Sequence, residues 1–162
     1  MAWNYPVHWN EIFRTTIRAS IIVSFATFLE TYLDRLCSHV ELIAKSGLNT
    51  HQRGDGTLKR SRKYLTAAGK FSRPSLDAWN GIALFFKVRH VIVHANGFVI
   101  GSKHRNAIEQ FCQKRADLRL QHGFLEIEPS FLEFLIDRLQ DFIRQLETEF
   151  RALCEETRQM ES

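Results

Sequence analysis

The sequence predicts an all-α fold, an antiparallel bundle of four or five helices. Apolar residues recur every three or four positions through two long segments, one near each end of the chain. Between these segments, Ser, Pro and Gly residues mark the starts and stops of shorter helices. At 162 residues the chain is long enough to bury a substantial core, so we expect one domain over 1–162.

The first long helix is expected from about Trp9 to Ser46, with Gly47 as its stop. Its middle, from Ile21 to Leu36, is apolar on more than one stripe, which is typical of a helix packed against several neighbours. Residues 49–57 show no apolar periodicity and predict a loop. A short helix is expected next, from about Leu58 to Ala68.

A central helix is expected from about Leu76 to Ala95, where Ser75 is suited to the N-cap and Gly97 to the position just beyond the end. A further short helix is compatible with residues 103–114. Its length and its ends carry weaker signals than those of the central helix.

The last third of the chain contains one candidate hairpin and the second long helix. Apolar residues alternate on both sides of His122-Gly123, which is compatible with a small β-hairpin near 118–127. Ser130 and Glu133 have the spacing of a capping box, which predicts that a long amphipathic helix begins there and continues to about Glu156.

Composition favours a cytoplasmic protein. No apolar run approaches the roughly 20 residues of a membrane span, so we expect no membrane contact. The first residues lack the basic and apolar regions of a secretory signal. Three widely spaced cysteines, Cys37, Cys112 and Cys154, fit neither a disulfide framework nor a cysteine zinc site.

Charge is distributed unevenly along the chain, which has a net charge of +4. Asp55 is the only acidic residue between Arg53 and Arg73, and no acidic residue occurs from Ala78 to Ile108. From Glu126 onward acidic residues predominate. A basic middle indicates a polyanionic partner, although a solvated basic loop explains the 53–73 segment equally well. The residues expected to contact that partner are Lys59, Arg60, Arg62 and Lys63.

The most informative stretch is residues 87–97, KVRHVIVHANG. Arg89 carries a permanent planar charge that matches a phosphate group, and His94 can accept or donate a proton near neutral pH. Together they could break a phosphodiester without a metal or cofactor. The spacing resembles the R-x4-6-H motif of the HEPN (higher eukaryotes and prokaryotes nucleotide-binding) superfamily, in which a polar residue, here His90, commonly follows the arginine.

The resemblance extends in outline to most of the chain, and at motif level only to residues 82–97. Many members also carry an acidic residue that faces the site from the first helix, and Glu30 in FATFLE resembles it. The resemblance implies a metal-independent endoribonuclease, a toxin of a toxin–antitoxin or phage-defence system, that works as a homodimer and is restrained by a partner protein. His94 would then move the proton and Arg89 would hold the phosphate.

Each site residue also has a structural interpretation. Arg89 could bond the carbonyls at the end of its helix, and His94 could be a half-buried packing residue. His90 and His94 have the spacing of two zinc ligands, but only Glu30 or His104 offers a third. We therefore expect His90 to orient His94 or to contact RNA. A solvated charge explains Lys87 and a helix-end cap explains Asn96, so both are weaker candidates for RNA contact.

The helix itself separates the two principal residues. Five residues of α-helix place Arg89 and His94 about 140° apart around the axis. Either the helix changes near Asn96, or the arginine reaches around, or a second subunit completes the site. The alternative function is a non-catalytic RNA-binding or assembly module of the same fold, and a third is a purely structural helical protein.

Overall fold

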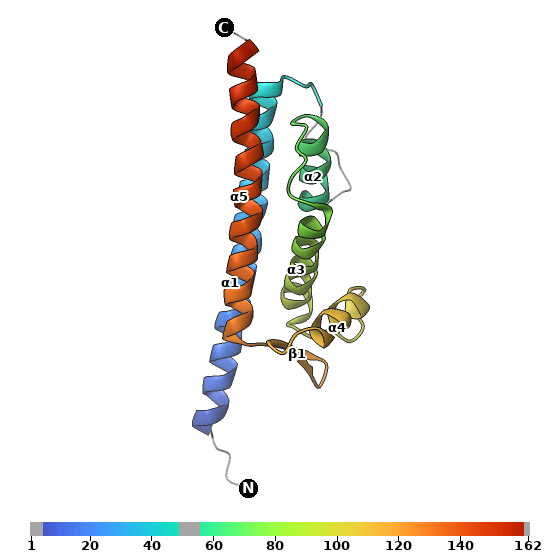
Figure 1. The fold of residues 1–162 in the computed structure, drawn as a ribbon. Coiled ribbons are helices and arrows are strands. Elements are labelled where there is room, and N and C mark those ends of the chain that lie inside the picture. Colours follow the sequence, from blue (N-terminus) through green and yellow to red (C-terminus); the bar gives the residue numbers. More distant parts are fainter. Residues whose placement is uncertain (1–4, 49–55, 161–162) are drawn as a thin grey trace. The chain divides into compact units, whose positions relative to one another are not determined.

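The computed structural model describes residues 5–48 and 56–160, with side chains from Ile12 onward. Its elements confirm the expected helical fold with one small hairpin (Figure 1). In chain order they are α1 (Tyr5–Ala44), α2 (Thr57–Ala67), α3 (Leu76–Ala95), α4 (Arg105–Gln113), β1 (Leu118–Gln121), β2 (Phe124–Ile127) and α5 (Pro129–Met160).

The chain divides into two compact units. The first contains the chain up to Ala26 together with Leu84–Asp137, and the second contains Thr27–Ala83 together with the chain from Arg138. The helices α1, α3 and α5 each contribute one part to both units. The candidate residues of the Arg-His stretch belong to the first unit, so each unit is described separately.

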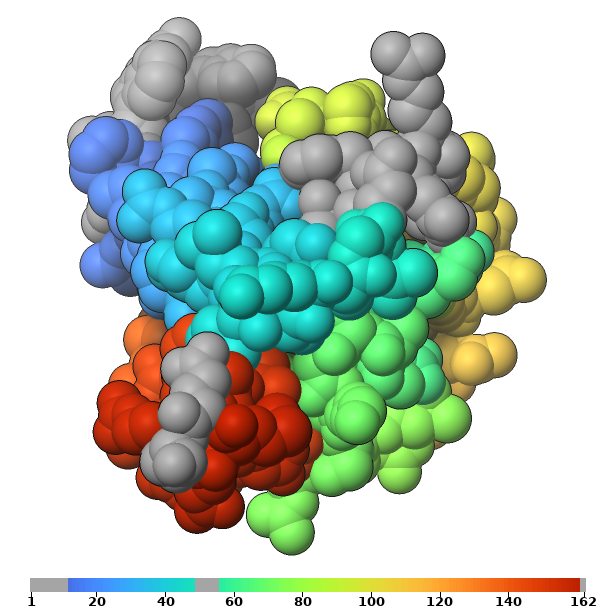
Figure 2. Space-filling view, turned by 90° about the horizontal axis from the view of Figure 1, so that it is seen from above, coloured from blue at the N-terminus to red at the C-terminus, as the bar shows by residue number. Residues whose placement is uncertain are grey.

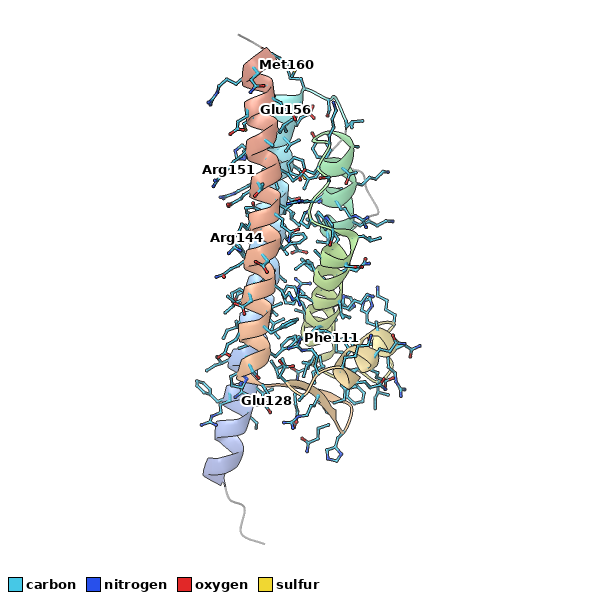
Figure 3. All side chains as sticks on the ribbon, in the orientation of Figure 1. Phe111, Glu128, Arg144, Arg151, Glu156 and Met160 are labelled. Carbon is cyan, nitrogen blue, oxygen red and sulfur yellow. The ribbon has the colours of Figure 1, made fainter. Side chains whose placement is uncertain are left out.

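In the second unit, the later part of α1 lies against α2 and against the end of α5 (Figure 2). The Trp79 ring meets the Phe142 ring edge-on, with 4.8 Å between centroids. At the end of α1, the hydroxyls of Ser46 and Tyr64 both donate to the Glu41 carboxylate. These contacts combine an apolar core with polar bonds at its margin. Along α5, Arg144 and Arg151 are exposed by 71% and 78% (Figure 3).

In the first unit, the hairpin pairs Leu118 with Ile127 and Gln121 with Phe124. Its two turn residues, His122 and Gly123, have φ of 50° and 86°, as the tight hairpin turn requires. The hairpin is bonded to the chain that follows α3. Val99 N–H donates to Gly123 C=O at 2.8 Å, and Leu125 N–H donates to Gly97 C=O at 2.9 Å.

Arg115 anchors the segment between α4 and β1. Its guanidinium lies 3.5 Å from the centroid of the Phe134 ring, and it also stacks near Phe111, which Figure 3 labels. Its Nε donates to the Asp117 carboxylate at 2.7 Å. The hydrogen bond from Arg115 holds the pKa of Asp117 below its ordinary value. The charge pair and the rings together fix where the hairpin begins.

Most helix ends lie within a few residues of the expected positions. Ser75 is the N-cap of α3, because its Oγ accepts the Ala78 N–H at 3.2 Å. The expected start of α5 at Ser130 is wrong: the helix begins at Pro129, because the fixed φ of proline suits the first helical position. It also continues to Met160, and α1 ends at Ala44, before Lys45 adopts a φ of 46°.

The first part of α1 has an apolar surface. Ile12, Phe13 and Ile17 are exposed by 45%, 66% and 44%. The hydroxyls of Ser20 and Ser24 donate to carbonyls four residues earlier in the same helix. By length and composition Ile12–Ala44 could cross a membrane, since an 18-residue window has a mean hydropathy of 1.4. From the sequence we expect no apolar run long enough to span a membrane, whereas this helix is long and apolar enough to do so. One such helix is weak evidence for a membrane span.

Two glycines provide a matched test of the hairpin packing. A Cβ at Gly123 would lie 2.6 Å from Ile100 and would need a φ that side chains rarely adopt, so we expect Gly123→Ala to lower the free energy of unfolding by about 1–3 kcal/mol. Gly81 lies within α3 with nothing near its Cβ position, so Gly81→Ala should raise it by about 0.5–1 kcal/mol. Urea unfolding monitored by circular dichroism measures both. Equal effects of the two substitutions would contradict this packing.

Candidate functional site

Three histidine rings gather at the end of α3. His90 and His94 lie one helical turn apart, and their ring centroids are 4.4 Å apart. The His104 ring meets the other side of His90 edge-on, with 4.9 Å between centroids. His90 is therefore the central member of a row of three groups that can each carry a proton.

The chain reversal after α3 brings His104 to this position. Asn96 and Gly97 both have positive φ, 49° and 81°, and α3 ends before them. Gly97 N–H donates back to Val91 C=O at 3.1 Å. Further along, the Ser102 Oγ accepts the His104 N–H at 3.1 Å, and its carbonyl accepts the Arg105 N–H at 3.0 Å. These bonds fix the loop from which α4 begins.

A hollow of about 310 Å³ lies beside the histidines. Its polar lining comes from His90, His94, Ser102 and Lys103, and its apolar lining includes Phe98 and Ile100. The hollow thus combines hydrogen-bonding groups and a cation with an apolar wall, a combination that is typical of small-ligand sites.

Burial and positive neighbours keep two of these histidines neutral. Burial, followed by the charges of His94, Lys103 and Arg89, lowers the pKa of His90 below its ordinary 6.5. Burial, followed by His90, Lys103 and Lys87, lowers the pKa of His104 in the same direction. Every charged neighbour that acts on these two rings is basic. At neutral pH both rings are therefore neutral and able to accept a proton.

Arg89 lies on α3 next to this group and is half-buried. Its Nε is buried and has no hydrogen-bond acceptor within the described part of the chain. Because α3 stays helical through Ala95, Arg89 and His94 leave the helix in directions about 140° apart. Consistent with this, His94 lines the hollow and Arg89 is not among the residues that line it.

The other predicted residues have different surroundings. Lys87 is half-buried on α3 and acts electrostatically on His104, while Asn96 is exposed just after the helix. Glu30 lies in the second unit, on α1, so its predicted contact with Arg89 or His94 stays a prediction.

In the predicted basic segment, Lys59, Arg60, Arg62 and Lys63 lie on α2 in the second unit, Lys70 and Arg73 follow that helix, and Arg53 falls outside the described residues. Lys59 and Lys63 are exposed and Arg62 is half-buried. The guanidinium of Arg60 lies 3.4 Å from the Asp34 carboxylate, so that carboxylate partly balances its charge. Arg60 and Asp34 also line a second hollow of about 330 Å³.

Two of the cysteines are poor nucleophiles. Burial is the largest cause that raises the pKa of both Cys37 and Cys112 to about 11. Both thiols therefore stay protonated at neutral pH. Among residues 5–48 and 56–160, no group of three His, Cys, Asp or Glu side chains is arranged to hold a metal ion.

Sequence reasoning assigned Lys103 no role and considered His104 only as a zinc ligand. The three rings are separated by only 14 positions, but nothing in that spacing reveals that His104 returns to His90. The available signal was the absence of acidic residues from Ala78 to Ile108, which marked the whole stretch as one basic surface. The fold then brings four of these bases together at the end of α3, namely His90, His94, Lys103 and His104.

Comparison with known proteins adds no assignment: no family model, curated protein or solved structure matches this chain.

Lys103 and Lys87 act on different sets of histidines, and the pKa values of His90 and His104 can show this. Lys103 lowers the pKa of both His90 and His104, so we expect Lys103→Gln to raise both pKa values. Lys87 acts on His104 and is not among the causes for His90, so Lys87→Gln should raise the pKa of His104 alone. Titration of the imidazole Cε1–H signals by NMR measures both. A lower pKa in either variant would contradict the arrangement.

Proposed function

We propose that this protein is a metal-independent endoribonuclease of the HEPN type, a toxin or phage-defence protein that cleaves RNA through attack by the 2′-hydroxyl. The observation that carries the proposal is the buried Nε of Arg89, which lacks an acceptor among the described residues and lies beside histidines whose charged neighbours are all basic. A buried guanidinium N–H without an acceptor is costly, and a phosphate oxygen would satisfy it.

In this proposal Arg89 binds the scissile phosphate. Its charge would stabilise the extra negative charge that develops on the phosphorane as the 2′-oxygen attacks, which is the main electrostatic demand of the reaction. Permanent protonation suits arginine to this role, because the guanidinium keeps its charge at every working pH.

His94 moves the proton. It is exposed at the rim of the hollow, where a ribose could reach it, and it takes the 2′-hydroxyl proton or returns one to the leaving 5′-oxygen. The phosphodiester P–O5′ bond breaks as the P–O2′ bond forms, leaving a 2′,3′-cyclic phosphate. DNA lacks the 2′-hydroxyl and would not be cleaved. The exposed lysines of α2 would add affinity that is independent of sequence.

We expect the purified protein to cleave single-stranded RNA in excess EDTA and to leave 2′,3′-cyclic or 3′-phosphate ends. Substitution His94→Ala should reduce the rate about 10²–10⁴-fold through loss of proton transfer. Arg89→Ala should reduce it about 10²–10³-fold through loss of charge stabilisation. Gel analysis of a labelled oligonucleotide measures the rates and the end groups.

The matched control is His39→Gln, which changes an exposed histidine on α1 in the second unit and should leave the rate unchanged. Cleavage that requires a divalent ion, or products with 5′-phosphate ends, would contradict the mechanism. RNA binding without any cleavage would instead support the alternative of a binding or assembly module.

A homodimer would reconcile the diverging directions of Arg89 and His94. In a two-fold assembly, His94 of one protomer can face Arg89 of its partner. Although the last part of α3 is rich in apolar residues, it offers little exposed apolar surface for such an interface. Phe85, Val88 and Val91 are buried within the chain, and Val93 is exposed by 45%.

We expect inactive Arg89→Ala protein and inactive His94→Ala protein to recover activity when they are mixed. Random exchange makes half of the dimers mixed, and each mixed dimer would hold one intact pair of groups, so about a quarter of the wild-type rate should return. The rate after mixing, with the mass checked by light scattering, is the measurement. No recovery from a confirmed mixed dimer would mean that each chain supplies its own pair.

A further inference from the structure

The loop between α3 and α4 carries two basic groups that the proposed cleavage step does not use. Lys103 lines the hollow beside His90 and His94, and the His104 ring packs against His90 at 4.9 Å. Ser102 fixes this part of the loop, because its Oγ and its carbonyl accept the N–H groups of His104 and Arg105. The loop is therefore built to hold these side chains where they are.

Among the described residues, no acidic side chain is one of the charged groups that act on His90 or His104. The charged groups that act on His90 are His94, Lys103 and Arg89, and those that act on His104 are His90, Lys103 and Lys87. Each of these groups is basic, and residues 78–108 contain no acidic residue. Each positive charge raises the free energy of the protonated form of its basic neighbours, and a bound anion would lower it.

We propose that Lys103, His104 and His90 form a second phosphate subsite, which binds a neighbouring phosphodiester of the RNA strand whose scissile phosphate lies at His94. The inference rests on the proposed function, since that function supplies the strand. It adds the requirement that a good substrate extends beyond the cleaved linkage.

The hollow suits one nucleotide unit of such a strand. Its volume of about 310 Å³ is at the lower end of small-ligand sites. Phe98 and Ile100 provide an apolar wall against which a ribose or base can pack, while Lys103 reaches the phosphate. The chemistry recognises the phosphodiester charge and not a base sequence.

Binding at this subsite is coupled to proton uptake. Burial and basic neighbours hold the pKa values of His90 and His104 below 6.5, so both rings are neutral in the free protein at neutral pH. A bound phosphate raises these pKa values because it favours the charged imidazolium. Affinity at the subsite therefore strengthens as the pH falls toward the pKa values of the free protein.

The test compares two probes that cannot be cleaved, because 2′-O-methylation blocks the attacking hydroxyl. One is a 2′-O-methyl dinucleoside monophosphate with one phosphate, and the other is the trinucleoside diphosphate with two. Calorimetry with the full chain should show that wild type gains about tenfold in affinity from the second phosphate at pH 6, as expected of one charge-assisted contact.

The variants are Lys103→Gln and His104→Gln, and the matched control is Arg105→Gln. Arg105 is the next residue along the chain, but it is paired with Glu109 at 2.7 Å and is not among the charged groups that act on His90 or His104. We expect the tenfold gain to disappear in both variants and to persist in the control. Affinity for the single-phosphate probe should change by no more than about twofold, because the reacting subsite remains available.

The effect of pH on binding of the longer probe distinguishes the contribution of His104 from that of Lys103. His104→Gln should weaken binding of the longer probe at pH 6 and have little effect at pH 8, where the ring is neutral in wild type too. Lys103→Gln should weaken it at both values. Lys103 is exposed, so this variant keeps the fold even if His104→Gln does not, which thermal melting would reveal.

A gain that persists in Lys103→Gln, or one that is lost equally in Arg105→Gln, would overturn the subsite. So would a wild-type protein that gains nothing from the second phosphate. Failure of the cleavage proposal gives a different result: the second phosphate still strengthens binding of these probes through Lys103 and His104, while unmodified RNA stays intact.

Discussion

The way in which α3 ends is the constraint on which the first unit depends. Two successive residues with positive φ, Asn96 and Gly97, stop the helix and turn the chain. The Gly97 carbonyl then accepts a hydrogen bond from Leu125, so the turn and the hairpin hold each other. Because the turn and the hairpin restrict the backbone at one end of the loop between α3 and α4, the loop returns His104 to His90. The row of histidines is therefore a consequence of backbone conformation at two positions, and not of any attraction between the rings.

Accumulated positive charge gives this region its chemical character. Desolvation and repulsion act in the same direction on His90 and His104, since both disfavour the protonated ring. The same surroundings contain a guanidinium whose Nε has no acceptor among the described residues. Arg115 differs, because the Asp117 carboxylate accepts two hydrogen bonds from its guanidinium. The contrast between these two arginines of one unit is the observation that supports the proposed phosphate contact of Arg89.

Local signals predicted the helices, the hairpin and the cap at Ser75, because each depends on residues close in sequence. The capping-box spacing predicts a start of α5 at Ser130, whereas the helix begins one residue earlier, because the fixed φ of Pro129 suits the first helical position. The division into two compact units and the return of His104 depend on contacts between distant segments, which periodicity does not contain. The Arg-His motif and helix geometry predicted that Arg89 and His94 point apart, and α3, which is helical through both residues, agrees with that prediction.

The hydroxyl groups of α1 change what kind of surface that helix presents. Ser20 and Ser24 are exposed, yet each donates its only hydrogen to a carbonyl of its own helix. A hydropathy scale counts both as fully polar, whereas each offers water only the acceptor lone pairs of its Oγ and no free donor. Next to Ile12, Phe13 and Ile17, they extend an apolar surface instead of interrupting it. At these two positions the helix backbone takes up the serine donors, so the first part of α1 offers water fewer hydrogen-bond donors than its composition indicates.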